Sequence, residues 1–306
     1  MLNHFILVLS ILMLSTAPVI VKFIELRPIV ILSWRLLFVS LMLVPFAYRK
    51  LKELPLADIK GILVTSLIFY IHFYTWFSGV PKLDVGVTAT IFALNPIFTA
   101  VFGFLVLKEE FKYRYLISII ASILGIHFTY YSTSSGSQNL LGVIQILVAS
   151  MTYSLYLIYS KKYRGELSNS VFTLLLNFGT CLLGAVTIII YLGTDQISLG
   201  ETIPKGGEVW TYLFLLALLP SLLGHTLMIY SLPFYNLNFI SCLKLFGPIN
   251  ASILAYFLLD EQFNEKVFLG LGLVTAGVLF ALPWGKGKLI LEKGKIISRI
   301  QKKIKQ

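Results

Sequence analysis

An internal repeat is the feature of this sequence that most restricts how the chain can fold. Residues 81–128 recur at residues 233–280 with a constant shift of 152 positions and no gap. Prolines, a glycine and a glutamate coincide, and Pro and Glu are rare enough in so apolar a chain that chance agreement is hard to obtain. The chain therefore contains two related halves. The coincident pairs are Pro81 and Pro233, Pro96 and Pro248, Glu109 and Glu261, and Gly125 and Gly277.

Composition defines the environment of these two halves. Of the 306 residues, 57% are hydrophobic and only 13% are charged, which a water-soluble domain of this size would not tolerate. A bilayer core about 30 Å thick is crossed by a helix of roughly 20 mainly apolar residues. Such stretches recur along the whole sequence and predict an integral membrane protein with ten spans. The predicted spans are residues 5–24, 28–47, 61–80, 85–107, 113–131, 140–160, 169–193, 209–232, 236–259 and 265–284.

The odd number of spans in each half predicts how the halves are oriented. Ten spans in two halves give five each, so the second half must enter the membrane upside down. The sequence thus predicts an all-α polytopic membrane protein with ten transmembrane helices as two inverted five-helix repeats. We expect the first repeat at residues 1–135, the second at residues 136–285 and a basic tail at residues 286–306.

The distribution of Lys and Arg predicts the orientation in the membrane. With the N-terminus inside, 18 of these residues lie in inner segments and five in outer segments, as expected for a plasma (inner) membrane protein with both termini in the cytoplasm. This topology explains the net charge of +11, so no nucleic-acid partner is expected. The tail alternates apolar residues at helical spacing with Lys and Arg, and we expect it to bind anionic lipids of the bilayer.

Segments around the two coincident prolines, together with an Arg in the second span, resemble the EamA domain of the drug/metabolite transporter superfamily. The resemblance extends over nearly the whole chain, with one such domain in each half. It implies a transporter of small metabolites with a central cavity between the halves, and it leaves the cargo open. The segments are Leu94-Asn95-Pro96 with Lys108-Glu109-Glu110, and Phe246-Gly247-Pro248 with Asp260-Glu261-Gln262, and the Arg is Arg35.

Two prolines and a lysine near the middle of the membrane are the first candidates for the transport pathway. Pro96 and Pro248 lie at the middles of predicted spans 4 and 9, and each frees the carbonyl four residues earlier, that of Phe92 or Lys244. These kinks are expected to act as hinges or as packing features. Lys244 carries a charge that costs roughly 2.5–3.5 kcal/mol at the bilayer centre. We expect it to hold a substrate carboxylate or phosphate, or else to bond helix-end carbonyls.

Histidine, tryptophan and arginine side chains in other spans are further candidates. His72 and His225 fall one position apart when the repeats are aligned, and imidazoles can titrate near neutral pH. Trp76 follows His72 by one helical turn and could stack on a planar or cationic ligand. Arg35 is a secondary candidate, because its guanidinium is expected to bond neighbouring carbonyls rather than cargo. Ordinary core packing is an alternative for each of these residues.

Polar side chains in the spans could line a wet route or join helix to helix. Asn95 and Asn250 flank the two kinks, and Tyr153 and Tyr230 lie in spans 6 and 8. Both cysteines lie within predicted spans, far apart in sequence, so neither a disulfide nor a metal site is expected. No cofactor is expected either.

The function predicted from these features is secondary transport by alternating access. The cargo would be small metabolites such as amino acids or related carboxylates and amines, moved through a central cavity by a monomer or a homodimer. The alternative is a membrane-embedded enzyme acting on lipid or sugar-phosphate substrates. Clustered carboxylates, a His/Asp pair or a phosphate-binding loop would favour that alternative, and the sequence shows none. We therefore expect no enzyme activity. Because no Asp or Glu lies in a predicted span, facilitated diffusion or exchange is at least as well supported as proton coupling.

Overall fold

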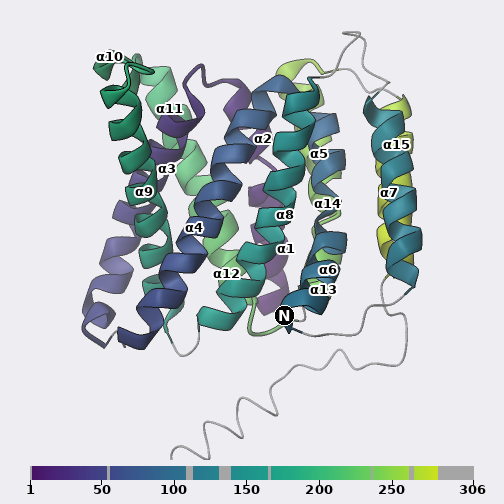
Figure 1. The fold of residues 1–306 in the computed structure, drawn as a ribbon, viewed down its shortest axis with the longest axis horizontal. Coiled ribbons are helices and arrows are strands. Elements are labelled where there is room, and N and C mark those ends of the chain that lie inside the picture. Colours follow the sequence, from purple (N-terminus) through teal and green to yellow (C-terminus); the bar gives the residue numbers. More distant parts are fainter. Residues whose placement is uncertain are drawn as a thin grey trace, which may run out of the picture.

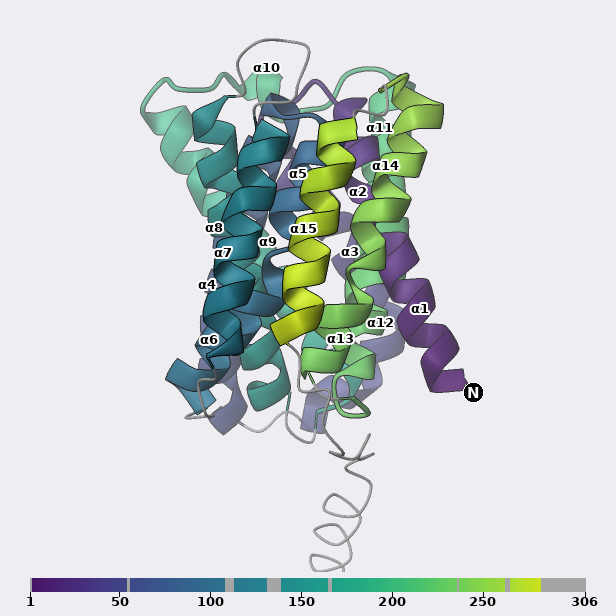
Figure 2. The same ribbon diagram turned by 90° about the vertical axis from the view of Figure 1, so that its right-hand side faces the viewer.

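The protein is helical throughout the part of the chain that the structure describes. No strand occurs there, and the helices lie side by side in a bundle (Figures 1 and 2). The predicted tail and Glu109 lie outside the described residues. The structure is a computed structural model and describes residues 2–53, 56–107, 113–130, 139–164, 167–235, 237–261 and 265–281.

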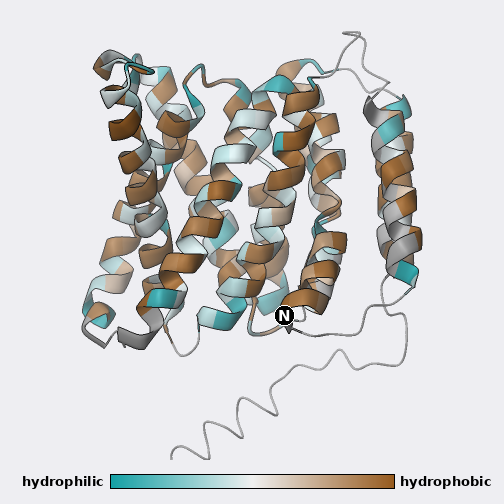
Figure 3. Ribbon diagram, viewed as in Figure 1, coloured by the Kyte–Doolittle hydropathy of each residue, from teal (hydrophilic) through white to brown (hydrophobic). Residues whose placement is uncertain are grey.

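Seven helical segments are long and apolar enough to cross a bilayer, so the chain is an integral membrane protein. Hydrophobic residues predominate along these helices (Figure 3). The ten predicted spans include three further stretches, whose main helices have only 17, 14 and 17 residues. The seven segments are Leu2–Lys22, Pro28–Leu51, Ile59–Lys82, Val85–Val106, Leu140–Tyr163, Asn169–Gly193 and Gly207–Ser231.

Each half of the sequence forms a comparable series of helices. The first half contains α1 (Leu2–Leu14), α2 (Ala17–Lys22), α3 (Pro28–Ala47), η1 (Tyr48–Glu53), α4 (Leu56–Gly79), η2 (Val80–Lys82), α5 (Val85–Phe92), α6 (Asn95–Leu107) and α7 (Arg114–Tyr130). The second half contains α8 (Leu140–Tyr163), α9 (Asn169–Gly193), α10 (Leu199–Thr202), α11 (Gly207–Leu216), η3 (Ala217–Thr226), α12 (Leu227–Ser231), α13 (Leu237–Leu243), α14 (Phe246–Leu259) and α15 (Glu265–Ala281).

The repeat in the sequence reappears in the boundaries of the helices. After a shift of 152 positions, α5, α6 and α7 begin within one residue of α13, α14 and α15. Figures 1 and 2 show α5 above α6 but α13 below α14. These two equivalent stretches therefore pass through the bundle in opposite directions.

Helices of one half pack mainly on helices of the other half. α3 lies along α9, α4 along α8, and α7 along α15. The last pair stands at one end of the bundle in Figure 1. Gly125 allows this close approach, because a Cβ there would lie 2.6 Å from the carbonyl oxygen of Gly270. The glycine at this position thus serves the packing of α7 on α15.

Two of the long stretches are interrupted immediately before the predicted proline kinks. α5 ends and α6 begins around Ala93–Leu94, and α13 and α14 meet at Lys244–Leu245. The backbone differs from expectation in one respect. The Lys244 carbonyl is not free, because it accepts the Gly247 N–H at 2.8 Å, one residue before Pro248. A tighter turn therefore replaces the hydrogen bond that the proline removes.

Two further irregularities interrupt other helices. α1 and α2 meet at Ser15–Thr16, and Pro18 lies in the first turn of α2. The second is η3, a π-helical segment that contains Pro220. Proline lacks the N–H that would bond the carbonyl of Leu216 in an α-helix. In the π-helical register the backbone donor lies five residues on, and the Ser221 hydroxyl also donates to that carbonyl, at 2.9 Å. The equivalent stretch of the first half, α4, has Ile68 in place of Pro220 and stays α-helical.

Candidate functional site

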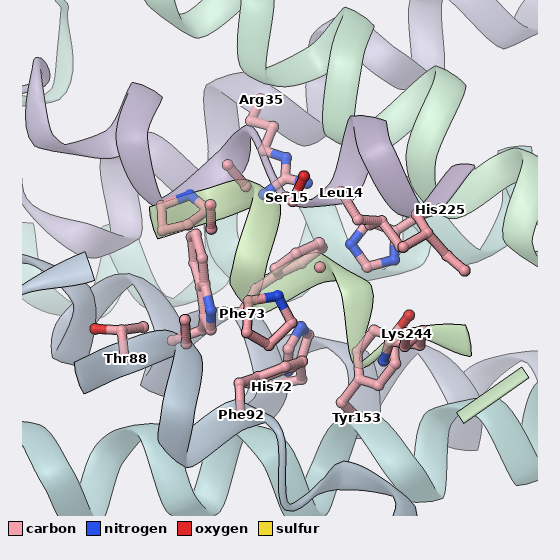
Figure 4. A pocket seen from close by; sticks show the side chains of 18 residues that line it. Leu14, Ser15, Arg35, His72, Phe73, Thr88, Phe92, Tyr153, His225 and Lys244 are labelled. Carbon is pink, nitrogen blue, oxygen red and sulfur yellow. The ribbon is translucent and has the colours of Figure 1, made fainter. Parts of the chain in front are cut away.

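The interruptions of the helices surround a cavity of about 100 Å³ in the interior of the bundle. Six of the nine predicted binding residues line it, and Pro248 does so as well. Figure 4 shows the cavity with these side chains around it. Helices α3, α4 and α8, the segment η3 and the junction of α13 with α14 supply them. The six predicted residues are Arg35, His72, Trp76, Tyr153, His225 and Lys244.

The other predicted residues lie outside the lining. Asn95 is behind Lys244 and accepts its hydrogen bond. Asn250 donates to the hydroxyl of Ser15, which does line the cavity. Tyr230 lies on α12 and packs against Phe234, with ring centroids 5.3 Å apart.

Lys244 projects from the junction of α13 and α14 and is held by two kinds of contact. Its Nζ donates to Asn95 Oδ1 at 3.2 Å and lies 3.5 Å from the centroid of the Tyr153 ring. The second contact is a cation–π interaction, which strengthens away from water. The Asn95 amide donates to Ser150 O at 3.2 Å and to Ser154 Oγ at 2.6 Å, so its oxygen is left to face Lys244.

Arg35 reaches the cavity from α3, and its guanidinium is only partly satisfied. Nε donates to Ser221 Oγ at 2.6 Å, and the guanidinium carbon lies 4.4 Å from the centroid of the Phe73 ring. The side chain is 1% exposed, and Nη2 has no hydrogen-bond partner in the described part of the chain. The π-helical turn places Ser221 where it can serve both Leu216 O and Arg35. The described hydrogen-bond partner of Arg35 is thus a hydroxyl and not one of the neighbouring carbonyls that were expected.

The two predicted histidines lie close together in the lining of the cavity, and they come from different halves of the sequence. Their ring centroids are 6.3 Å apart. Nδ1 of His72 lies 2.9 Å from Ala149 O, and since a carbonyl only accepts, Nδ1 must carry the proton there. Nδ1 of His225 is buried without a partner among the described residues. His225 therefore keeps an unused hydrogen-bonding atom inside the bundle.

The charge in this cavity is uncompensated within the described part of the chain. No Asp or Glu is among the lining residues. An ion pair between Arg27 and Glu201, at 3.1 Å, lies instead at an exposed end of the bundle. No group of three or more His, Cys, Asp or Glu side chains is arranged to hold a metal ion in the described ranges. Arg35 and Lys244 thus line the cavity without an anionic partner among the residues that the structure describes.

Several lining residues escaped prediction from the sequence. Phe73, Phe92 and Ser15 were not selected, and neither was Ser221, which orients Arg35. The signal for Ser15 is a Ser-Thr pair three residues before a proline within an apolar span, and the signal for Ser221 is Pro220 in the middle of another. Phe73 and Phe92 have no such signal, because aromatic residues are common throughout the spans.

Comparisons with known proteins agree with this architecture. The model of the EamA-like transporter family matches residues 1–131 and 140–282. An uncharacterized transporter of Clostridium kluyveri is 25% identical over 258 residues, which cover 78% of each chain. The uncharacterized transporter YdfC of Bacillus subtilis is 24% identical over 247 residues, 80% of this chain and 78% of YdfC.

A solved structure shares the fold. A crystal structure of another protein matches with a TM-score of 0.66 at 13% identity, covering 91% of this chain and 96% of that chain. At that identity the match concerns the arrangement of helices only. The family match, by contrast, spans both halves of the sequence. The chain belongs to the EamA-like transporter family of the drug/metabolite transporter superfamily.

Proposed function

We propose that this protein is a secondary transporter that moves small metabolites by alternating access, through the cavity between its two halves. The observation that carries the proposal is the cavity itself, because it lies where related stretches of opposite direction meet. A unit and its inverted copy can exchange conformations, so a state open to one side implies an equivalent state open to the other. Amino acids or related carboxylates and amines are cargo of suitable size.

The packing of the helices supports a two-fold relation between the halves. Residues 1–135 and 136–285 would each contribute five spans, with α1 and α2 equivalent to α8, and α4 equivalent to α11, η3 and α12. If each helix is replaced by its equivalent in the other half, the pair α4 and α8 becomes the pair η3 and α1. Both pairs are in contact. The packing of α6 on α8 likewise becomes that of α14 on α1 and α2, which also occurs.

Contacts near the ends of the bundle follow the same relation. Lys22, at the end of α2, donates to Leu83 O just before α5, at 2.7 Å. Lys161, near the end of α8, donates to Tyr235 O just before α13, at 3.3 Å. A shift of 152 positions brings Leu83 onto Tyr235. Equivalent loops are therefore tied by equivalent lysines, as expected for two conformationally interchangeable halves.

The orientation in the membrane completes the proposal. We place both termini in the cytoplasm and the protein in the plasma membrane, because the excess of Lys and Arg then lies on the inner side. The basic tail, residues 286–306, would lie against anionic lipids of that side.

Counterflow in liposomes tests the proposed function. Purified protein is reconstituted, the vesicles are loaded with an unlabelled amino acid or carboxylate, and entry of the labelled solute is followed. Labelled solute should accumulate transiently and saturably for at least one cargo, because the outward gradient of unlabelled solute drives the exchange on a carrier. Protein-free vesicles are the control. Uptake that is never saturable and never stimulated by internal solute would indicate a channel and contradict alternating access.

A further inference from the structure

We infer that the cargo is a small carboxylate with an apolar body, bound between Arg35 of the first half and Lys244 of the second. The inference rests on the proposed transport function, because it names the cargo of that transport. It concerns the recognition of this cargo, however, and binding measurements alone can test it. It selects one class from the amino acids, carboxylates and amines considered above. The argument uses the unfilled hydrogen-bonding capacity of the two cations, the absence of a counter-charge and the nature of the walls.

Arg35 has a donor available for a ligand. Its side chain is buried and lines the cavity. Nε is taken by Ser221, whereas Nη2 is buried and lacks a partner in the described part of the chain. A buried donor without a partner is costly, and a charged one especially so. A carboxylate in the cavity would satisfy this donor in the geometry that guanidinium groups favour.

Lys244 also keeps unused donors. Its ammonium group has three hydrogens, and the structure describes one hydrogen bond from it, to Asn95 Oδ1. The Tyr153 and Phe92 rings flank the ammonium, with centroids 3.5 and 5.3 Å from Nζ. Aromatic faces stabilise the positive charge but do not neutralise it. Figure 4 shows Lys244 and Arg35 in different parts of the lining.

The charge balance favours an anion and disfavours an ammonium. Two cations line the cavity, and no carboxylate does. Charges within the membrane interior are normally paired, and here the cargo can supply the missing negative charge. An ammonium group would find no acidic partner in the described lining and would be repelled by both cations. Simple amines should therefore bind poorly, and zwitterions less well than the corresponding carboxylates.

The walls define the rest of the ligand. Phe73, Trp76 and Phe92 present rings to the cavity, and the aliphatic Leu14 and Ala251 add to them. The lining contains only two hydroxyl-bearing aliphatic side chains, Ser15 and Thr88. A sugar or polyol would leave most of its hydroxyl groups without partners. A short branched or aromatic body suits this surface better.

The location of the two cations links recognition to transport. Arg35 comes from α3 and Lys244 from the junction of α13 and α14, so a bound carboxylate would join the two halves. Binding between mobile units favours the arrangement in which both can reach the ligand. The carboxylate would thus favour a closed, occluded form.

A matched trio of ligands tests the inference on the detergent-purified protein. Leucine, 4-methylpentanoate and 3-methylbutylamine share one apolar body and differ in charge, and binding is measured as a rise in melting temperature with ligand concentration. The carboxylate should bind most tightly and the amine least. Lys244→Met should weaken carboxylate binding about tenfold to a hundredfold, the loss of a charged hydrogen bond. It should leave amine binding unchanged or improved.

Controls separate a binding role from a structural one. Lys205→Met removes the same charge from an exposed loop and should not change the order of affinity among the three ligands. Lys244→Arg keeps the charge and should retain most of the preference for the carboxylate. The wild-type trio tests the inference even if substitutions at 244 fail to fold.

Distinct outcomes overturn the inference and the proposed function. Amine binding equal to or tighter than carboxylate binding sinks the inference, and so does inorganic phosphate that displaces the carboxylate completely at lower concentration. Counterflow of some other solute would then leave the transport function intact. Preferential binding of the carboxylate without counterflow of any solute would contradict the transport function but would still support the inferred recognition site.

Discussion

At the scale of single residues, the central feature is the way Asn95 and Lys244 depend on each other. The Asn95 amide uses its hydrogens on Ser150 and Ser154 of α8, which turns Oδ1 toward the lysine. Asn95 was expected either to line a wet route or to join helix to helix, and in the structure it joins α8 to Lys244 behind the lining of the cavity. A polar residue beside a helix break can therefore act through a neighbour rather than on the cargo.

A double-mutant cycle should detect this dependence. We expect Asn95→Ala and Lys244→Met to be non-additive in the free energy of unfolding, with a coupling of about 0.5–3 kcal/mol, since the two side chains share one hydrogen bond. Asn177 is an equally buried asparagine that donates to Thr173 O within its own helix. Asn177→Ala combined with Lys244→Met should be additive within about 0.5 kcal/mol. Equal coupling in both cycles, measured by unfolding in mixed micelles, would rule out a specific link.

At the scale of elements, interruptions of helices create the site. The breaks in α1–α2, α5–α6 and α13–α14 and the π-helical η3 all border the cavity. An irregular backbone needs replacement hydrogen bonds inside a membrane protein, because lipid offers none. Ser221 makes two such contacts with one hydroxyl, which donates to Leu216 O at the start of η3 and accepts the bond from Arg35.

Removal of that hydroxyl should cost more than removal of an ordinary helix serine. Ser221→Ala removes the hydroxyl that donates to Leu216 O, and it leaves the charged Nε of Arg35 without its described partner, so we expect a loss of about 1–3 kcal/mol in unfolding free energy. Ser231 is equally buried and donates only one described bond, to Leu227 O of its own helix. Ser231→Ala should cost nearer 0.6 kcal/mol, roughly the average for such bonds in membranes. Similar losses in denaturant titrations of the two variants would argue against a double role for Ser221.

At the scale of the whole molecule, the main feature is that the equivalent stretches α5–α6 and α13–α14 run in opposite directions through the bundle. The segment α5–α6 descends in Figure 1, and α13–α14 ascends. The cavity is lined from both halves of the sequence, by His72 and Arg35 from the first half and by His225 and Lys244 from the second. Movement of one half against the other would change access to the cavity from both membrane faces.

Labelling from one side of the membrane tests this arrangement directly. Lys82 and Phe234 are equivalent under the 152-residue shift and lie three residues beyond the ends of α4 and α12. In a background without Cys181 and Cys242, Lys82→Cys should react with an impermeant maleimide in intact cells. Phe234→Cys should react only after permeabilisation. Labelling of both from the same side would contradict the inverted arrangement, and Lys205→Cys provides an outer-side control.

The sequence by itself determined the class of the protein, its membrane location and the repeat, because these depend on patterns along the chain. Apolar length, rare coincident prolines and a lone intramembrane lysine can all be recognised without coordinates. It also identified six residues that line the cavity. Only the tertiary structure decided that Asn95 supports Lys244, that Ser221 supports Arg35, and that Asn250 and Tyr230 lie away from the lining. The physical reason is that these roles depend on contacts between helices that are distant in sequence. Such contacts require a particular rotation of each helix about its axis. Packing sets that rotation, and the pattern of apolar residues does not determine it.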